Sequence, residues 1–237
     1  MASSIKVISS MATRQFLSEL AAQFQDASGQ QVSLESVGGV DAAKRVQAGE
    51  VFDLVVLASN VIDQLSAEGW IVAGSRADLV HSGVAVVVKS GAPHSDISTE
   101  EALKNVVSGA KSIGYSTGPS GNHLTRLFER WGIAGDIKDR IVQARPGVPV
   151  GTLVAKGEVE LGFQQLSELM HLAGVDILGP LPPSAQIITT FSAGVAAVST
   201  QPEAARALSA FLASPAAAEA KRKNGMDPAC HAATHSD

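Results

Sequence analysis

Short continuous apolar stretches alternate along this chain with longer stretches in which apolar side chains recur every three or four residues. Residues 5–8 predict a strand, and residues 14–27, with Phe16, Leu20 and Phe24 on one helical face, predict a helix. The same alternation predicts further strands at 31–36, 53–57, 84–89, 113–115, 141–143, 161–164 and 189–198. It predicts further helices at 40–47, 60–68, 99–107, 122–131, 149–156, 202–212 and 215–224. Strands that alternate with helices indicate βαβ units, so the predicted fold class is α/β.

The pattern changes near Val80, where the strand predicted at 84–89 carries the chain away from the first sheet. We therefore expect two lobes, with residues 1–80 plus 195–237 in lobe 1 and residues 81–194 in lobe 2. Each lobe is expected to have a mostly parallel central sheet flanked by helices. Ligands of such sheets bind beyond the carboxyl ends of the strands, so we expect a ligand cleft between the lobes.

Two of the predicted strand-to-helix loops are rich in hydroxyl groups. One follows the strand at 113–115 and contains Ser120, and the other follows the first strand and contains Ser10 and Thr13. Hydroxyls and unpaired backbone N–H groups at the start of a helix favour an anion, because the helix dipole places partial positive charge there. The alternative is that both are ordinary helix caps, which Ser and Thr supply in any α/β protein. Two such loops, one in each expected lobe, favour a ligand-binding site over ordinary helix caps.

Composition excludes several classes of protein. Of 237 residues, 45% are hydrophobic and 17% are charged, which is typical of a compact globular chain. The net charge of −5 and the absence of a Lys/Arg run argue against a nucleic-acid partner. The single cysteine, Cys230, allows no internal disulfide, and we expect the tail with His231 and His235 to be disordered rather than metal-binding. No metal or other cofactor is expected.

The sequence contains no apolar run long enough to span a membrane, and its first residues do not have the pattern of a signal peptide. A cytoplasmic location is therefore expected for the chain as it stands, or a periplasmic one if a leader has been removed. An ABC permease is expected as a partner only if the chain is exported.

The chain resembles the type II periplasmic-binding-protein fold, and most closely its molybdate-binding branch. The segments that carry the resemblance are Ile5-Lys-Val-Ile-Ser-Ser, Val46-Gln-Ala-Gly-Glu-Val-Phe-Asp-Leu-Val, Gly114–Gly121, Val154-Ala-Lys-Gly-Glu-Val-Glu-Leu-Gly-Phe and Ser214-Pro-Ala-Ala. They cover the chain from Ile5 to about Met226. The resemblance implies two lobes that close on a small ligand.

The resemblance also implies where an oxyanion would bind. Molybdate-type members use a serine after the first strand, a serine before the second helix, an alanine N–H, a valine N–H and a tyrosine hydroxyl. In this sequence those positions are Ala12, Gly39, Ser120, Gly147 and Gln165. Because hydroxyl donors are missing from both lobes, we expect a larger organic anion rather than molybdate. A di- or tricarboxylate suits the Arg and Gln side chains nearby.

The resemblance and the loops together give one set of candidate ligand-binding residues: Ser10, Thr13, Arg14, Gly39, Ser120, Arg145, Gly147 and Gln165. Aconitate isomerases share this fold, so the chain is either a binding protein or an isomerase that moves a proton across a tricarboxylate. A cytosolic sensor is a third hypothesis.

Individual side chains have competing interpretations. Arg14 could bind a carboxylate or lie on a solvated helix face, and His123 could be a catalytic base or a half-exposed polar residue. Asp53 opens a buried strand, where a structural hydrogen-bonding role is expected. Glu168 is expected on the solvated surface. Alternation places either Gln164 or Gln165 toward the ligand, and we favour Gln165.

Overall fold

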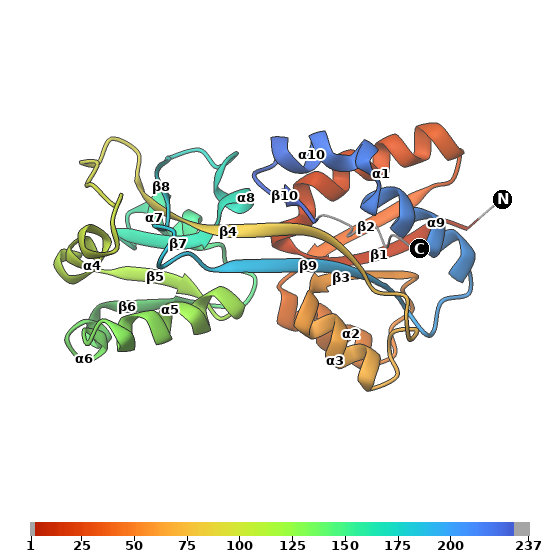
Figure 1. The fold of residues 1–237 in the computed structure, drawn as a ribbon, viewed down its shortest axis with the longest axis horizontal. Helices are drawn as coiled ribbons and strands as arrows, with labels where there is room; N and C mark the ends of the chain where they lie inside the picture. Colours follow the sequence, from red (N-terminus) through yellow and green to blue (C-terminus); the bar gives the residue numbers. More distant parts are fainter. Residues whose placement is uncertain (1–2, 230–237) are drawn as a thin grey trace, which may run out of the picture. The chain divides into compact units, whose positions relative to one another are not determined.

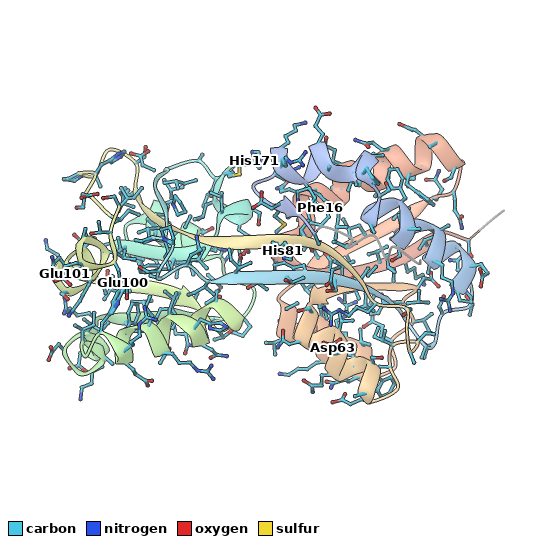
Figure 2. The ribbon with its side chains drawn as sticks, viewed as in Figure 1. Phe16, Asp63, His81, Glu100, Glu101 and His171 are labelled. Atoms are coloured by element: carbon cyan, nitrogen blue, oxygen red, sulfur yellow. The ribbon has the colours of Figure 1, made fainter. Side chains whose placement is uncertain are left out.

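The computed structural model describes residues 3–229, and Cys230, His231 and His235 lie outside this range. The chain forms two compact units, unit 1 with residues up to His81 and from Thr190 onward, and unit 2 with Ser82–Thr189. The lobe boundaries expected from the sequence are 80/81 and 194/195. Two long strands, β4 (Ala77–Lys89) and β9 (Ile188–Val195), contain the crossing points (Figure 1). His81, labelled in Figure 2, and Thr190 share a hydrogen bond of 3.0 Å where the chain leaves and re-enters unit 1.

Unit 1 is built on three parallel strands, β1 (Ile5–Ser10), β2 (Val32–Val37) and β3 (Leu54–Ala58), in the order β2-β1-β3. Strand β9 pairs antiparallel with β3, and the short β10 (Asp227–Pro228) pairs antiparallel with β4. The helical elements are η1 (Met11–Thr13), α1 (Arg14–Ser28), α2 (Gly39–Gln47), α3 (Ser59–Ala67), α9 (Pro202–Ala213), η3 (Pro215–Ala217) and α10 (Ala218–Lys223).

Helices cover both faces of the unit 1 sheet, as Figure 1 shows, with α1, α9 and α10 on one face and α2 and α3 on the other. Val7 and Leu54 belong to the core beneath α1, whereas Ile8 and Val55, the next residues along β1 and β3, belong to the core beneath α2 and α3. A strand buried on both faces must be apolar at every position, which explains the continuous apolar stretches in the sequence.

Unit 2 repeats this arrangement with β5 (Ile113–Ser116), β6 (Ile141–Ala144) and β7 (Leu161–Gln165), parallel in the order β7-β5-β6. Strand β4 pairs antiparallel with β7 and with β8 (Val175–Pro180). The helical elements are α4 (Glu100–Gly109), α5 (Pro119–Arg130), α6 (Ala134–Ile137), η2 (Lys138–Arg140), α7 (Val150–Lys156) and α8 (Leu166–Leu169). One core contains Phe128 and Phe163, and the other contains Val87, Val150 and Val154.

The α/β class and the mixed sheets with helices on both faces agree with the sequence analysis. The helix expected at 99–107 begins at Glu100, and its N-cap is Thr99, whose hydroxyl accepts from the Ala102 N–H at 3.1 Å. Strands β8 and β10 and the short helices α6 and α8 were not predicted, since elements this short or half-buried have weak periodicity. The helix predicted to begin at 122 begins at Pro119, because Pro is favourable in a first turn.

Residues 3–229 lack two features that would indicate other kinds of function. No helix there is long and apolar enough to cross a membrane. No group of His, Cys, Asp and Glu side chains in that range has the arrangement of a metal site.

Candidate functional site

The carboxyl ends of the parallel strands in unit 1 meet at one edge of the sheet. Strand β1 ends at Ser10, which is level with Val37, the last residue of β2, and β3 ends at Ala58. A helical element follows each strand within two residues. Its N-cap residue is Ser10, Gly38 or Ala58, and none of these supplies a side-chain cap. The first N–H groups of a helix have no partner within the helix, so this edge presents backbone donors.

Ser10 is the most informative residue at this edge. Its side chain is buried, with 7% of the residue exposed, and its Oγ is the one buried side-chain polar atom in residues 3–229 without a hydrogen-bond partner. Its carbonyl, by contrast, accepts from Ser9 Oγ at 3.1 Å and from Thr13 Oγ1 at 3.0 Å. An unpaired buried hydroxyl costs about 1–3 kcal/mol, so its persistence needs an explanation.

Two glycines lie at the start of α2, next to Ser10. A Cβ built on Gly39 would lie 3.9 Å from the Ser10 Cβ, so the first turn of α2 lies beside the Ser10 side chain. The N-cap of α2 is Gly38, which has no side chain to occupy the helix N-terminus. A hydroxyl donor beside an uncapped helix N-terminus has the chemistry of an anion subsite.

The other two side-chain candidates in unit 1, Thr13 and Arg14, differ in whether they are exposed to a ligand. Thr13 is fully buried and its hydroxyl bonds to Ser10, so this hydroxyl shapes the loop. Arg14, the first residue of α1, is exposed and has no ion pair with any described residue. A guanidinium at this position can donate two parallel hydrogen bonds to a carboxylate.

Unit 2 has an equivalent edge, and the loop after β5 is its tightest part. Gly121 N donates to Gly118 O at 3.0 Å, and a Cβ on Gly121 would lie 1.9 Å from Ser116 O. Only glycine fits there, because the clash would be with backbone. Ser120 is buried beside it, whereas His123 is exposed. His123 is the fifth residue of α5, whereas the helix expected at 122–131 would make it the second.

The loop after β6 is exposed from Arg145 to Val148. It turns at Gly147, where φ is +78°, and Val148 N donates to Arg145 O at 2.9 Å. The loop then enters α7. Because β5, β6 and β7 are parallel neighbours, this loop, the Ser120 loop and the residues after β7 share one edge of the sheet.

The two glutamines at the end of β7 point to opposite faces. Gln165 is buried, accepts from Ser82 Oγ at 2.5 Å and donates to Thr189 Oγ1 at 3.5 Å. Gln164 is also buried and accepts from Gly151 N, in α7, at 2.9 Å. Both carboxamides therefore have partners inside unit 2, and a ligand at Gln165 would have to replace one of its bonds.

Glu168 was expected on the solvated surface, and that expectation is wrong. The side chain is half-buried in α8, and burial raises its pKa to about 7, although a hydrogen bond with Gln164 acts in the opposite direction. Sequence reasoning missed it because a lone Glu in a polar stretch usually lies on the surface. The available signal was its position, four residues after Gln164 and just beyond a buried strand.

The structure thus gathers the candidates into two sets, each within one unit. Ser10, Thr13, Arg14 and Gly39 lie at the carboxyl edge of unit 1. The loops at the carboxyl edge of unit 2 contain Ser120, Arg145, Gly147 and Gln165, together with His123.

Comparison with known proteins identifies relatives over nearly the whole chain. The family model described as bacterial extracellular solute-binding protein matches residues 5–227. A protein from Pseudomonas sp named aconitate isomerase is 38% identical over 232 residues, covering 94% of this chain and 87% of the relative.

Two solved structures have similar folds at low sequence identity. The Azotobacter vinelandii periplasmic molybdate-binding protein has a TM-score of 0.78 and 20% identity, with 94% of this chain and 98% of that chain covered. A periplasmic thiamin binding protein has a TM-score of 0.77 and 18% identity, with 98% of this chain and 85% of that chain covered. The fold is therefore that of type II periplasmic binding proteins, and structures with this fold bind chemically different ligands.

Proposed function

The chain belongs to the family of bacterial extracellular solute-binding proteins, and on this basis we propose that it binds a small organic anion of the di- or tricarboxylate class. The observation that carries the proposal is the buried Ser10 hydroxyl, which lacks a partner beside the uncapped N-terminus of α2. A bound carboxylate would accept from this hydroxyl and from the first N–H groups of α2. Arg14 would neutralise its charge.

The residues at the candidate site support an organic anion over molybdate. Ala12 and Gly39 have no side-chain donor, and the Gln165 carboxamide bonds to Ser82 and Thr189. A small tetrahedral dianion would therefore meet fewer hydroxyl donors than the molybdate-type pattern provides. The exposed Arg14 at the edge of unit 1 suits a carboxylate, because its guanidinium can donate two parallel hydrogen bonds.

We further propose that the chain isomerises its ligand, as the name of the Pseudomonas relative indicates for that protein. The reaction would interconvert trans- and cis-aconitate by a 1,3-proton shift. A base removes a proton from the CH₂ group, the C–H electron pair enters the conjugated system, and an acid returns a proton to the former vinyl carbon. The double bond moves by one position, and no oxidant or cofactor is needed.

Where the protein works is a separate proposal. The family description favours an exported protein over the cytoplasmic location expected from the sequence. Fractionation of cells that express the native gene would distinguish the two, and an ABC permease is a partner to test only if the protein is exported.

Calorimetry and product analysis test the proposal together. We expect trans-aconitate or tricarballylate to bind and to raise the melting temperature, since a ligand at 100 times its Kd stabilises by about 2.7 kcal/mol. NMR in deuterated water should show cis-aconitate forming from trans-aconitate. Stabilisation by molybdate alone would contradict the organic-anion proposal, and tight binding without isomerisation would leave a binding protein.

A further inference from the structure

Gly39 is a glycine that its backbone conformation does not require. It is the first residue of α2, and it is not among the described glycines with a positive φ. Gly29, which follows α1 with a φ of +72°, is by contrast a glycine that the backbone does require. Glycine is less favourable in a helix than alanine, because it loses more conformational freedom on folding. Gly39 therefore lowers the stability of α2 without a conformational reason.

Packing does not require a glycine at position 39 either. A Cβ on Gly151 would lie 2.5 Å from Leu172, and a Cβ on Gly162 would lie 2.7 Å from Val154, so side chains are excluded at both positions. A Cβ on Gly39 would contact the Ser10 Cβ at 3.9 Å, which is an ordinary van der Waals distance. Apart from its chain neighbours and the backbone of α2, no other described heavy atom lies within 4 Å of that Cβ position. Gly39 thus leaves a space beside Ser10 that a methyl group could fill.

Ser10, which borders this space, is held in place by its own backbone. Its carbonyl accepts hydrogen bonds from Ser9 Oγ at 3.1 Å and from Thr13 Oγ1 at 3.0 Å. Its Oγ is buried and has no partner within residues 3–229. A space beside an unpaired buried hydroxyl and an uncapped helix N-terminus is suited to an acceptor group of a ligand. All of these groups belong to unit 1.

The charges at the same edge favour a single carboxylate over a dianion. Asp41 is half-buried in the first turn of α2, and Arg14 is the first residue of α1. Because Coulomb energy is proportional to charge, Asp41 repels a dianion about twice as strongly as it repels one carboxylate group at the same place. Arg45, in the last turn of α2, is already paired with Glu35 and Glu50. One carboxylate of a larger organic anion therefore matches this edge better than a small dianion does.

We propose that Gly39 determines which anions the protein accepts, and this inference rests on the proposed function. The absent side chain leaves room for a carboxylate group, and for the carbon that carries it, next to Ser10 Oγ and the first N–H groups of α2. A methyl group at position 39 would fill part of this room, so the ligand would have to move away from both kinds of donor. The same methyl group would stabilise α2. Gly39 thus favours ligand binding over helix stability.

Calorimetric titration and urea denaturation of G39A, with G109A as the matched control, test this inference. Gly109 is the exposed last residue of α4, it has no positive φ, and a Cβ there would meet no atom within 4 Å. Both variants should unfold at the same or a slightly higher urea concentration than the unmodified protein. G39A should weaken trans-aconitate binding by about tenfold or more, because the added methyl group displaces the ligand. G109A should keep the affinity of the unmodified protein.

G39S distinguishes the space at position 39 from a hydrogen-bonding role. Its Cβ fills the same position and its hydroxyl adds a donor beside Ser10, so it should bind trans-aconitate as weakly as G39A does. Molybdate should bind G39S more tightly than G39A, because a tetrahedral oxyanion has a further oxygen to accept from a second hydroxyl. Recovery of trans-aconitate affinity in G39S would mean that position 39 acts through a donor rather than through space. Equal molybdate affinities of G39S and G39A would contradict a role in selecting the anion.

Failure of this inference and failure of the proposed function give different results. If the unmodified protein binds trans-aconitate and folded G39A binds it equally tightly, the ligand does not use the space at Gly39 and the inference alone is wrong. Loss of both affinity and stability in G39A would mean that the Cβ does not fit, which would also contradict the inference. If the unmodified protein binds neither trans-aconitate nor tricarballylate, the proposed function is wrong, and this inference with it.

Discussion

The two ends of the unit 1 sheet differ in whether their buried polar groups have hydrogen-bond partners. At the amino end, Asp53 is buried and accepts from Lys6 N at 2.8 Å, Ser199 Oγ at 2.6 Å and Gln201 Nε2 at 2.9 Å. At the carboxyl end, the buried Ser10 hydroxyl has no partner among the described residues. A fully paired network makes a fold rigid, whereas an unpaired buried donor indicates a missing partner. The amino end is therefore structural, and the carboxyl end is where we expect a ligand.

The largest effect on stability should come from removing the hydrogen bonds that Asp53 accepts at the amino end. D53A removes the acceptor of three hydrogen bonds and leaves buried donors unpaired, so it should reduce the free energy of unfolding by about 3–4 kcal/mol. Urea denaturation measures this, with the exposed D26A as control. Ligand affinity of the folded protein should not change. If D53A instead lost ligand affinity and kept its stability, the amino end would be the ligand-binding end and this assignment would be wrong.

A buried lysine gives a second test of the distinction between structural polar groups and ligand-binding ones. Lys221 in α10 is 1% exposed, and burial lowers its pKa from 10.5 to about 8. The unfolded state then binds more protons between pH 8 and 10.5, so stability should rise with pH across that range. K221M should stabilise the protein by about 3 kcal/mol at pH 7, and this gain should shrink above pH 8 and vanish near pH 10.5.

Thermal unfolding of K221M against pH checks this, with K223M on the exposed face of α10 as control. If K221M instead lowers ligand affinity at constant stability, Lys221 belongs to a binding site rather than to the core.

The exposed guanidinium at the carboxyl end should matter for the ligand and not for the fold. R14A should weaken trans-aconitate binding by about 30-fold, or about 2 kcal/mol, and leave the midpoint of urea unfolding unchanged. K44A removes the same charge from the last turn of α2 and should have a much smaller effect. Equal losses in R14A and K44A would mean that only net charge acts on the anion.

The sequence predicted more of the fold than of the site for a physical reason. Strands buried on both faces and amphipathic helices produce strong periodic patterns, so β1, β3 and α1 were placed within a few residues. The structural role expected for Asp53 agrees with its three hydrogen bonds. The partners of Gln165, Ser82 and Thr189, are distant in the sequence, and no local pattern encodes such contacts.

The role of Ser10 also could not be decided from the sequence alone. Its position after the first strand suggested an anion loop, but that sequence pattern is shared with ordinary helix caps. Only the structure distinguishes the two, because it shows that the hydroxyl caps no N–H group and has no other partner among the described residues.

Calorimetric titration of S10A and S9A with trans-aconitate tests the central claim most directly. Ser9 is buried next to Ser10, but its hydroxyl bonds to Ser10 O at 3.1 Å and Ser36 Oγ at 2.7 Å. S10A should weaken binding by about tenfold, or about 1.4 kcal/mol, with unfolding stability unchanged or slightly raised. S9A should lower stability by about 1 kcal/mol and keep the affinity of the unmodified protein. Unchanged affinity in S10A, with a loss of stability instead, would contradict the assignment of this edge to the ligand.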